Sequence, residues 1–339
     1  MAKDLKLMFC PLDVAGSENV GTARGWKYHL GAENVLYYDY LARSRQLSIE
    51  QVNIEILDLA KQYNLFYCQL QDTNVITPQT LLELKDMGLF VFQWNGDCRS
   101  NITKYMLECA KVCDINFHTG EGICQNYRNK GVFNVACWQI ACDNYDLFPD
   151  GYIQDFITPE IVMCGNHYNK VFPESDFRLE VARTLQKEFG SRFGVVGSGW
   201  PSDVRVVGQN KLRDQGKVYA HPNCKIIIGV NHYSDCETFY SDRQFIAMAS
   251  GKPYITNYIK GMEKDFVINR ENFHGQWRDW QCMVMNSPIA CLVADINTLL
   301  ETQEMRQVIG NNGKNFILAK HTWEARIGEI MPIIQKHIK

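Results

Sequence analysis

The sequence lacks a long apolar run, a signal for export and an excess of positive charge. No window approaches the roughly eighteen consecutive apolar residues that a membrane-spanning helix needs. The N-terminus has a short basic start but no apolar core of a signal peptide, so we expect a cytoplasmic protein. The formal net charge of −3 argues against a protein that binds nucleic acid through a basic surface.

The 13 cysteines include no Cys-x-x-Cys pair. Cys109 and Cys113 lie four residues apart on a predicted helix, but no second pair of ligands completes a zinc site. We therefore expect the cysteines to be small buried apolar residues in a reducing compartment. A serine nucleophile elbow, a His-Glu-x-x-His zinc motif and a Walker loop are missing too.

The length and composition indicate a globular protein of two domains. With 339 residues the chain is long for one hydrophobic core and sufficient for two. Because 46% of the residues are hydrophobic and low-complexity tracts are missing, the chain is not of the disordered class. No repeat of solenoid type occurs either.

The first 140 residues alternate short β-branched or aromatic runs with amphipathic stretches. This alternation predicts βαβ units and a parallel, doubly wound sheet. The strand-like runs are apolar throughout, as expected for a sheet covered on both faces. Strands are predicted in 5–12, 34–40, 65–70, 89–95, 112–118 and 134–140, and helices near 19–30, 48–62, 78–87, 100–110 and 121–129.

Residues 141–160 contain Pro, Gly and several Asp without periodicity, and we interpret them as the connection between two domains. The alternation then restarts, which predicts a second doubly wound domain. Thr322 is a candidate cap of the last helix, and Pro332 is expected to kink it. Strands are predicted at 161–166, 193–197, 225–230 and 253–256, and helices at 175–189, 209–215, 237–250, 295–318 and 322–337.

Two glycine-containing segments follow predicted strands, where ligands of open α/β sheets bind. The first is the loop of Gly16, Ser17, Glu18 and Asn19, a candidate acceptor or phosphate loop. The second runs from Gly194 to Trp200. In each case a ligand contact and a plain turn both remain open.

The strongest segment runs from Glu237 to Pro253. Ser241 and Asp242 can cap a helix whose first turn holds Arg243. A cation there opposes the positive end of the helix dipole, and an anionic ligand would resolve this mismatch. The structural alternative is an ion pair of Arg243 with Asp242 or Glu237.

The charge distribution also favours a phosphate-bearing ligand in the second half. Residues 1–150 carry 13 Lys and Arg against 18 Asp and Glu, whereas the remainder carries 22 against 20. In the acidic first half, Asp97 and His118 each follow a predicted strand and are the candidates for acid–base or positioning roles. We expect His118 to move a proton near neutral pH.

The stretch from Tyr240 to Gly251 resembles the S-D-R-x-F-E-A-M-A-S-G signature of CgeB-like glycosyltransferases, which are related to the group-1 retaining transferases. Three further matches follow the family order, and the resemblance covers about residues 160–339. They are Cys164-Gly-Asn-His-Tyr, Gly197-Ser-Gly-Trp200 and His321-Thr-Trp-Glu-Ala-Arg326-Ile.

The resemblance implies an α/β protein of the GT-B fold, with two Rossmann-like doubly wound domains facing a cleft. It implies an acceptor-side domain at 1–150, a nucleotide-sugar-binding domain at 151–322 and a last helix, 323–339, that crosses back to the first domain. Sugar transfer with retention and without a bound metal or other cofactor is expected. No Asp-x-Asp occurs, which fits the absence of a metal. The implied donor site consists of Gly197, Gly199, Trp200, Glu237, Tyr240, Ser241, Asp242 and Arg243.

One departure affects this expectation. The family glutamate before Ala-Met-Ala, which holds sugar or ribose hydroxyls in related transferases, is Ile246 here. Glu237 is a candidate substitute. One alternative is therefore a non-catalytic relative that binds a nucleotide sugar or glycan. Another is a different reaction on the same fold, that of a sugar-nucleotide epimerase.

The sequence leaves the donor, the acceptor and the oligomeric state open. A surface glycan, a protein and a modified base of phage DNA are all possible acceptors for this branch. The acidic first half disfavours duplex DNA, because duplex binding depends on Lys and Arg contacts to phosphate.

Overall fold

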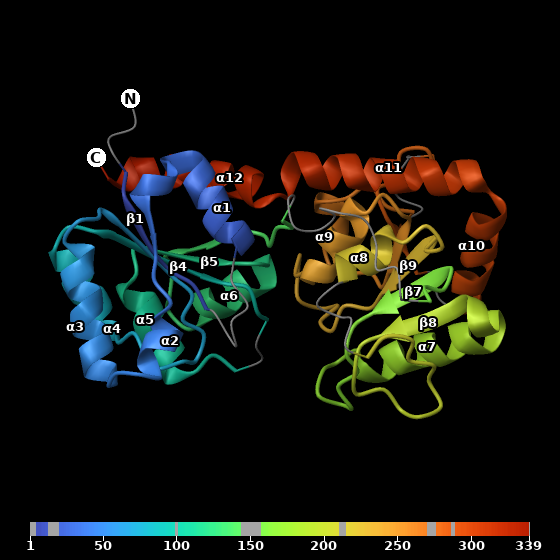
Figure 1. Cartoon of the computed structure of the whole chain (residues 1–339), viewed down its shortest axis with the longest axis horizontal. Coiled ribbons are helices and arrows are strands. Elements are labelled where there is room, and N and C mark those ends of the chain that lie inside the picture. The colour runs from blue at the N-terminus through green and yellow to red at the C-terminus, as the bar shows by residue number, and fades with distance from the viewer. Residues whose placement is uncertain are drawn as a thin grey trace. The chain divides into compact units, whose positions relative to one another are not determined.

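The computed structural model describes residues 5–12, 20–98, 101–143, 157–209, 215–269, 276–285 and 289–338 (Figure 1). The chain forms two compact units, one of Met1–Ile140 with Trp323–Lys339 and one of Ala141–Thr322. In the described part of the chain, no helix is both long and apolar enough to cross a membrane.

The first unit contains a six-stranded parallel sheet in the order β2-β1-β3-β4-β5-β6. All six strands predicted for this half are confirmed, whereas the short helix α2 was not predicted. The strands are β1 (Leu7–Cys10), β2 (Val35–Tyr37), β3 (Leu65–Cys68), β4 (Phe90–Asn95), β5 (Ile115–His118) and β6 (Val135–Cys137). The helices are α1 (Val20–Leu30), η1 (Ala32–Asn34), α2 (Tyr40–Ser44), α3 (Ile49–Ala60), α4 (Pro78–Asp86), α5 (Lys104–Val112), α6 (Glu121–Asn129) and α12 (Trp323–His337).

Local capping explains where several of these helices begin. Ser48 and Gln51 bond reciprocally at the start of α3, with N–H to side-chain oxygen distances of 3.2 and 3.0 Å. Thr77 caps α4, whose first residue is Pro78, a position at which proline loses no helical hydrogen bond. Thr103 caps α5, which begins later than predicted.

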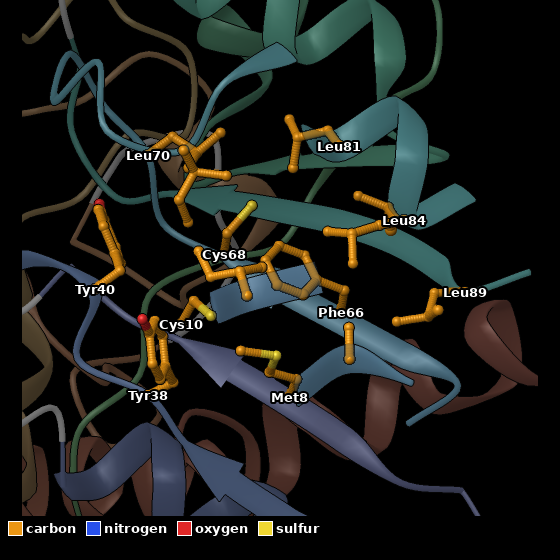
Figure 2. Packing of buried hydrophobic residues seen from close by; sticks show 14 of the residues in the cluster. Met8, Cys10, Tyr38, Tyr40, Phe66, Cys68, Leu70, Leu81, Leu84 and Leu89 are labelled. Carbon is orange, nitrogen blue, oxygen red and sulfur yellow. The ribbon is translucent and has the colours of Figure 1, made fainter. Parts of the chain in front are cut away.

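Alternate side chains of the first sheet enter two different cores. On one face Met8, Cys10, Phe66 and Cys68 pack against apolar residues of α3, α4 and α5, as Figure 2 shows for Leu81 and Leu84 of α4. Burying this apolar cluster is the main favourable contribution to the stability of the unit.

The opposite face is aromatic and receives the C-terminal helix. The ring of Phe9 stacks on Tyr67 at 4.8 Å, and Trp26 of α1 lies edge-on to Phe92 at 5.7 Å. Trp323, the first residue of α12, packs edge-on against Trp94 at 5.5 Å. The last helix therefore returns to the first unit, as predicted, and lies beside α1 (Figure 1).

The second unit contains a five-stranded parallel sheet in the order β11-β10-β9-β7-β8. The two parallel-sheet units confirm the predicted fold class. The strands are β7 (Ile161–Cys164), β8 (Phe193–Val196), β9 (Ile226–Gly229), β10 (Tyr254–Thr256) and β11 (Met283–Val284). The helices are α7 (Ser175–Phe189), η2 (Gly190–Arg192), α8 (Gln215–Ala220), α9 (Asp242–Ala249), η4 (Met262–Lys264), α10 (Ile289–Glu301) and α11 (Gln303–Lys320).

Two predictions for this unit are corrected. The single helix predicted at 295–318 is two helices, α10 and α11, with Thr302 between them in an extended conformation. The helix predicted at 237–250 begins only at Asp242, because residues 237–241 form a loop. Of the helix predicted at 209–215 only residues 209 and 215 are described, and Gln215 is the first described residue of α8. The strand β11 was not predicted. Most of the predicted connection 141–160 lies outside the described residues.

Candidate anion-binding site at the strand ends of the second unit

The carboxyl ends of β7, β8 and β9 bring three loops together. These strands are neighbours in the sheet, so the loops 165–168, 197–200 and 230–234 lie at one edge. Ligands of open α/β sheets bind at this edge.

Close contact between the first two loops explains the predicted glycine segment. Gly197 has φ 145° and Gly199 has φ 77°. A Cβ added to either glycine would come within 2.3 Å of a carbonyl oxygen, that of Gly165 or of His167 respectively. Loop packing alone thus requires both glycines, and their predicted contact with a ligand stays a prediction.

Polar side chains hold the two loops in this arrangement. The Asn166 Oδ1 atom accepts hydrogen bonds from the Ser198 N–H at 2.9 Å and from its hydroxyl at 3.0 Å. The indole N–H of Trp200 donates to the Gly165 carbonyl at 2.9 Å. The Trp200 ring also packs against His167, so this residue braces the predicted donor site.

The loop after β9 positions the start of α9. The backbone N–H of Asn231 donates to Asn257 Oδ1 at 2.7 Å, and Asn231 Oδ1 accepts from the Ser241 N–H at 2.9 Å. The first residues of α9 are thereby fixed to the same sheet edge. Helix N-termini favour anions because their backbone N–H groups point outward.

At the start of α9, Asp242 is shared between its two neighbours. Its Oδ1 accepts from the Ser241 hydroxyl at 3.0 Å and from the Arg243 N–H at 2.8 Å. The Arg243 guanidinium lies 3.8 Å from the same oxygen and is 23% exposed. The ion pair with Asp242 foreseen as the structural alternative is therefore present, but at a distance too long for a good hydrogen bond.

Arg178 was not predicted and is the most unusual residue of this edge. It lies on α7 and is only 1% exposed. Its Nη1 atom donates to the Asn166 carbonyl and to His232 Nε2, both at 2.8 Å. Nε and Nη2 are buried and have no hydrogen-bond partner among the described residues. Burial, and then the nearby charge of Arg243, lower the pKa of Arg178 to about 9.

The sequence contains a signal that could have found Arg178. The position shares its helix face with Val181, Ala182 and Leu185, at the spacing of the buried stripe of α7. A charge on an apolar stripe is rare unless it has a partner or a function.

The contact with Arg178 fixes the form of His232. An arginine nitrogen can only donate, so His232 Nε2 accepts and the proton resides on Nδ1. Burial, followed by the charges of Arg178, Arg243 and His167, lowers the pKa of His232 to about 3. The imidazole is neutral at pH 7, and its buried Nδ1 has no hydrogen-bond partner within the described structure.

In the first unit, Asp97 and His118 lie at the ends of the neighbouring strands β4 and β5, as predicted. Asp97 is exposed and accepts from Gln71 Nε2 at 2.7 Å. His118 is fully buried, and its ring stacks on Tyr127 at 4.2 Å. Burial lowers its pKa to about 3, so the expectation that His118 moves a proton near neutral pH is wrong. Its positioning role stays a prediction.

The remaining predicted donor residues have structural contacts. Tyr240 is buried, and its hydroxyl donates to Asp265 Oδ2 at 2.8 Å. Glu237 pairs with Lys264 and Lys260, and Lys264 is the main cause that lowers the pKa of Glu237. The loop of Gly16, Ser17, Glu18 and Asn19 lies outside the described residues.

Two other observations bear on the choice of site. A groove of about 450 Å³ lies between α3 and α4, but its lining holds three carboxylates, Asp58, Glu83 and Asp86, against one lysine, Lys61, and this excess of negative charge disfavours an anion. Among the described residues, no group of three His, Cys, Asp or Glu could hold a metal ion. The expected independence from metal remains a prediction.

Comparison with known proteins identifies the architecture. The glycosyltransferase from Rickettsia africae superposes with a TM-score of 0.65 at 11% identity, covering 99% of this chain and 98% of that chain. HepE of Anabaena, solved in complex with UDP-glucose, gives 0.63 at 11% identity, with 98% and 100% coverage. The chain has the GT-B fold.

Two further comparisons complete this picture. The family model described as "Glycosyl transferase-like" matches residues 176–332, which include Arg178, His232 and Arg243. A putative UDP-N-acetylglucosamine 2-epimerase from Listeria monocytogenes superposes with a TM-score of 0.54 at 9% identity, covering 98% of this chain and 96% of that chain. No match was found among curated proteins.

Proposed function

We propose that this protein transfers a sugar from a nucleotide-sugar donor to an acceptor hydroxyl. The observation that carries the proposal is the start of α9, where Arg243 stands in a first helical turn at a sheet edge that already holds Arg178. Both arginines lie within the segment 176–332 that the glycosyltransferase-like family model matches. The GT-B architecture, shared with a protein solved with UDP-glucose, gives further support.

In the proposed reaction, an acceptor oxygen forms a bond to the anomeric carbon while the bond from that carbon to the phosphate oxygen breaks. The leaving nucleoside diphosphate gains negative charge, which the Arg243 guanidinium and the α9 N-terminus stabilise. The acceptor hydroxyl passes its proton to the departing phosphate oxygen. A side-chain base is then not required, which is compatible with the neutral, buried His118.

The finer features of the proposal follow from the resemblance to CgeB-like enzymes. They are retention at the anomeric carbon, independence from metal, and an acceptor that is a surface glycan, a protein or a modified nucleobase. We propose a cytoplasmic location, because all 13 cysteines, each within the described residues, are free thiols.

Two specific observations favour other candidate functions. Ile246, in place of the family glutamate, is compatible with a relative that binds a nucleotide sugar without turnover. The likeness to the putative epimerase from Listeria monocytogenes is compatible with an epimerisation reaction.

Release of nucleoside diphosphate from nucleotide sugars, measured with and without candidate acceptors, tests the proposal. We expect release that depends on the acceptor, together with a glycosylated product detected by mass spectrometry. Arg243→Ala should lower the rate about 100-fold or more, because the leaving group loses a charge-assisted contact. Arg183→Ala is the matched control, since Arg183 is half exposed and pairs with Asp203. Epimerised donor without product would favour the epimerase, and binding without turnover would favour the non-catalytic relative.

A further inference from the structure

Arg178 is a buried cation without a carboxylate. No ion pair of Arg178 occurs among the residues that the structure describes, and the charged residue that lowers its pKa most is a second cation, Arg243. A buried charge is costly unless an opposite charge or a full set of hydrogen bonds compensates for it. Of the five N–H donors of Arg178, only the two on Nη1 form hydrogen bonds to described residues.

A second hydrogen-bond donor without a described partner lies beside Arg178. The neutral His232 presents an Nδ1–H group that no described residue accepts. His167 Nδ1 lies 3.3 Å from the Gly199 carbonyl and donates to it. Two unpartnered guanidinium nitrogens and one imidazole N–H fit a ligand that accepts several hydrogen bonds and carries negative charge.

The position of these groups connects them to the start of α9. Arg178 binds the loop after β7 through Asn166 and the loop after β9 through His232, and the latter loop is bonded to Ser241 through Asn231. Arg178 and Arg243 both lower the pKa of His232, which indicates that their charges reach the same place. A phosphoryl group bound between them would compensate for both charges.

We propose that Arg178 and His232 form a phosphate-recognition pair that binds the anionic group of the ligand together with the α9 N-terminus. This inference rests on the proposed function and deepens it, because it assigns the diphosphate of the donor to two residues outside the α9 segment. Arg178 supplies charge. His232 supplies a single N–H donor of fixed orientation.

The experiment is calorimetric titration of the full chain with inorganic pyrophosphate, UDP and uridine. For the wild type we expect binding of the two diphosphates and much weaker binding of uridine. Arg178→Met should weaken the binding of both diphosphates about tenfold or more. Arg183→Met on the same helix is the control and should bind as the wild type does.

Two measurements separate ligand binding from a structural role. Because Arg178→Met loses the two Nη1 hydrogen bonds, its melting temperature without ligand is compared with that of Arg183→Met, and affinities are compared at a temperature at which both are folded. Pyrophosphate should raise the melting temperature of the wild type but not that of Arg178→Met. His232→Ala should weaken pyrophosphate binding, and His232→Asn should restore part of it, because its amide N–H lies near the position of Nδ1.

The outcomes distinguish this inference from the proposed function. Unchanged diphosphate affinity in a folded Arg178→Met and in His232→Ala overturns the inference, even if sugar transfer is found. Binding that depends on Arg178 without any sugar transfer supports the inference and counts against the proposed function. If pyrophosphate binds and UDP does not, the pair recognises free phosphates, and its assignment to the donor diphosphate is overturned. A wild type that binds neither diphosphate overturns the inference.

Discussion

At the scale of single residues, the second unit buries a positive charge and hydrogen-bond donors that in most proteins would have a counter-charge or acceptors. Arg178 is buried beside Gly165, and a Cβ on this glycine would lie 2.4 Å from Arg178 Nη2. The glycine thus makes room for the guanidinium. Its φ of 146° also disfavours any other residue.

Gly165→Ala is expected to displace the Arg178 guanidinium without removing a polar atom. We expect pyrophosphate affinity to fall by about tenfold, because charge-assisted hydrogen bonds depend on geometry. Titration calorimetry on a folded variant measures this. Gly88→Ala is the control, since Gly88 also has positive φ but nothing lies near its added Cβ. Equal affinity of the two variants would contradict the account of Gly165.

His118 makes the stability of the first unit depend on pH. Its pKa in the folded chain is about 3, below the usual 6.5, so the unfolded chain binds the extra proton first as pH falls. Its effect on the free energy of unfolding is constant above about pH 6.5 and becomes destabilising between about 6.5 and 3, by about 1.4 kcal/mol per pH unit. Urea denaturation should show that the free energy of unfolding falls less between pH 7 and pH 5 in His118→Gln than in the wild type. An equal loss in both proteins would contradict the buried, neutral state of His118.

At the scale of helices and strands, α9 determines what the site can bind. Ile246 lies three residues after Arg243, so the two side chains share one face of the helix. A glutamate at 246 would add a carboxylate able to pair with Arg243. A glutamate at 246 would thus be a second carboxylate beside Arg243, in addition to Asp242.

We expect Ile246→Glu to weaken the binding of nucleotide sugars and to lower turnover, because the new carboxylate competes with phosphate for Arg243. Ile246→Gln, of similar size but neutral, is the control. Affinity and acceptor-dependent product formation measure the effect. A gain of activity in Ile246→Glu would contradict the proposed transferase and favour a relative that lost its activity.

The elements were predictable where local patterns decide them, and the site was predictable only in part. Continuous apolar runs identified the six strands of the first unit, and the alternation of strands with helices identified α9. The break at Thr302 was missed because α10 and α11 continue one apolar period. Arg178 and His232 lie 54 residues apart, and their contact depends on which strands are neighbours. No local pattern contains this information.

At the scale of the whole molecule, the chain folds as two units, and the last helix returns to the first. Trp323 closes the aromatic core formed by Trp94 and Trp138, with ring distances of 5.5 and 6.0 Å. Trp323→Ala should destabilise the first unit by about 3–5 kcal/mol, as for other large buried aromatic residues. Hydrogen exchange measured by mass spectrometry should show faster exchange in the first unit than in Ala141–Thr322. Uniform acceleration in both units would contradict this assignment of α12 to the first unit.

The central claim is that the second unit binds a nucleotide sugar at the edge holding Arg243 and Arg178. A thermal-shift panel of UDP-, GDP-, ADP- and dTDP-sugars tests it most directly, because a ligand that binds only the folded state raises the melting temperature. We predict that at least one donor raises the melting temperature by about 2–5 °C at saturating concentration, and that Arg243→Ala abolishes the shift while leaving the fold intact. A panel in which no nucleotide sugar stabilises the wild type would contradict the claim.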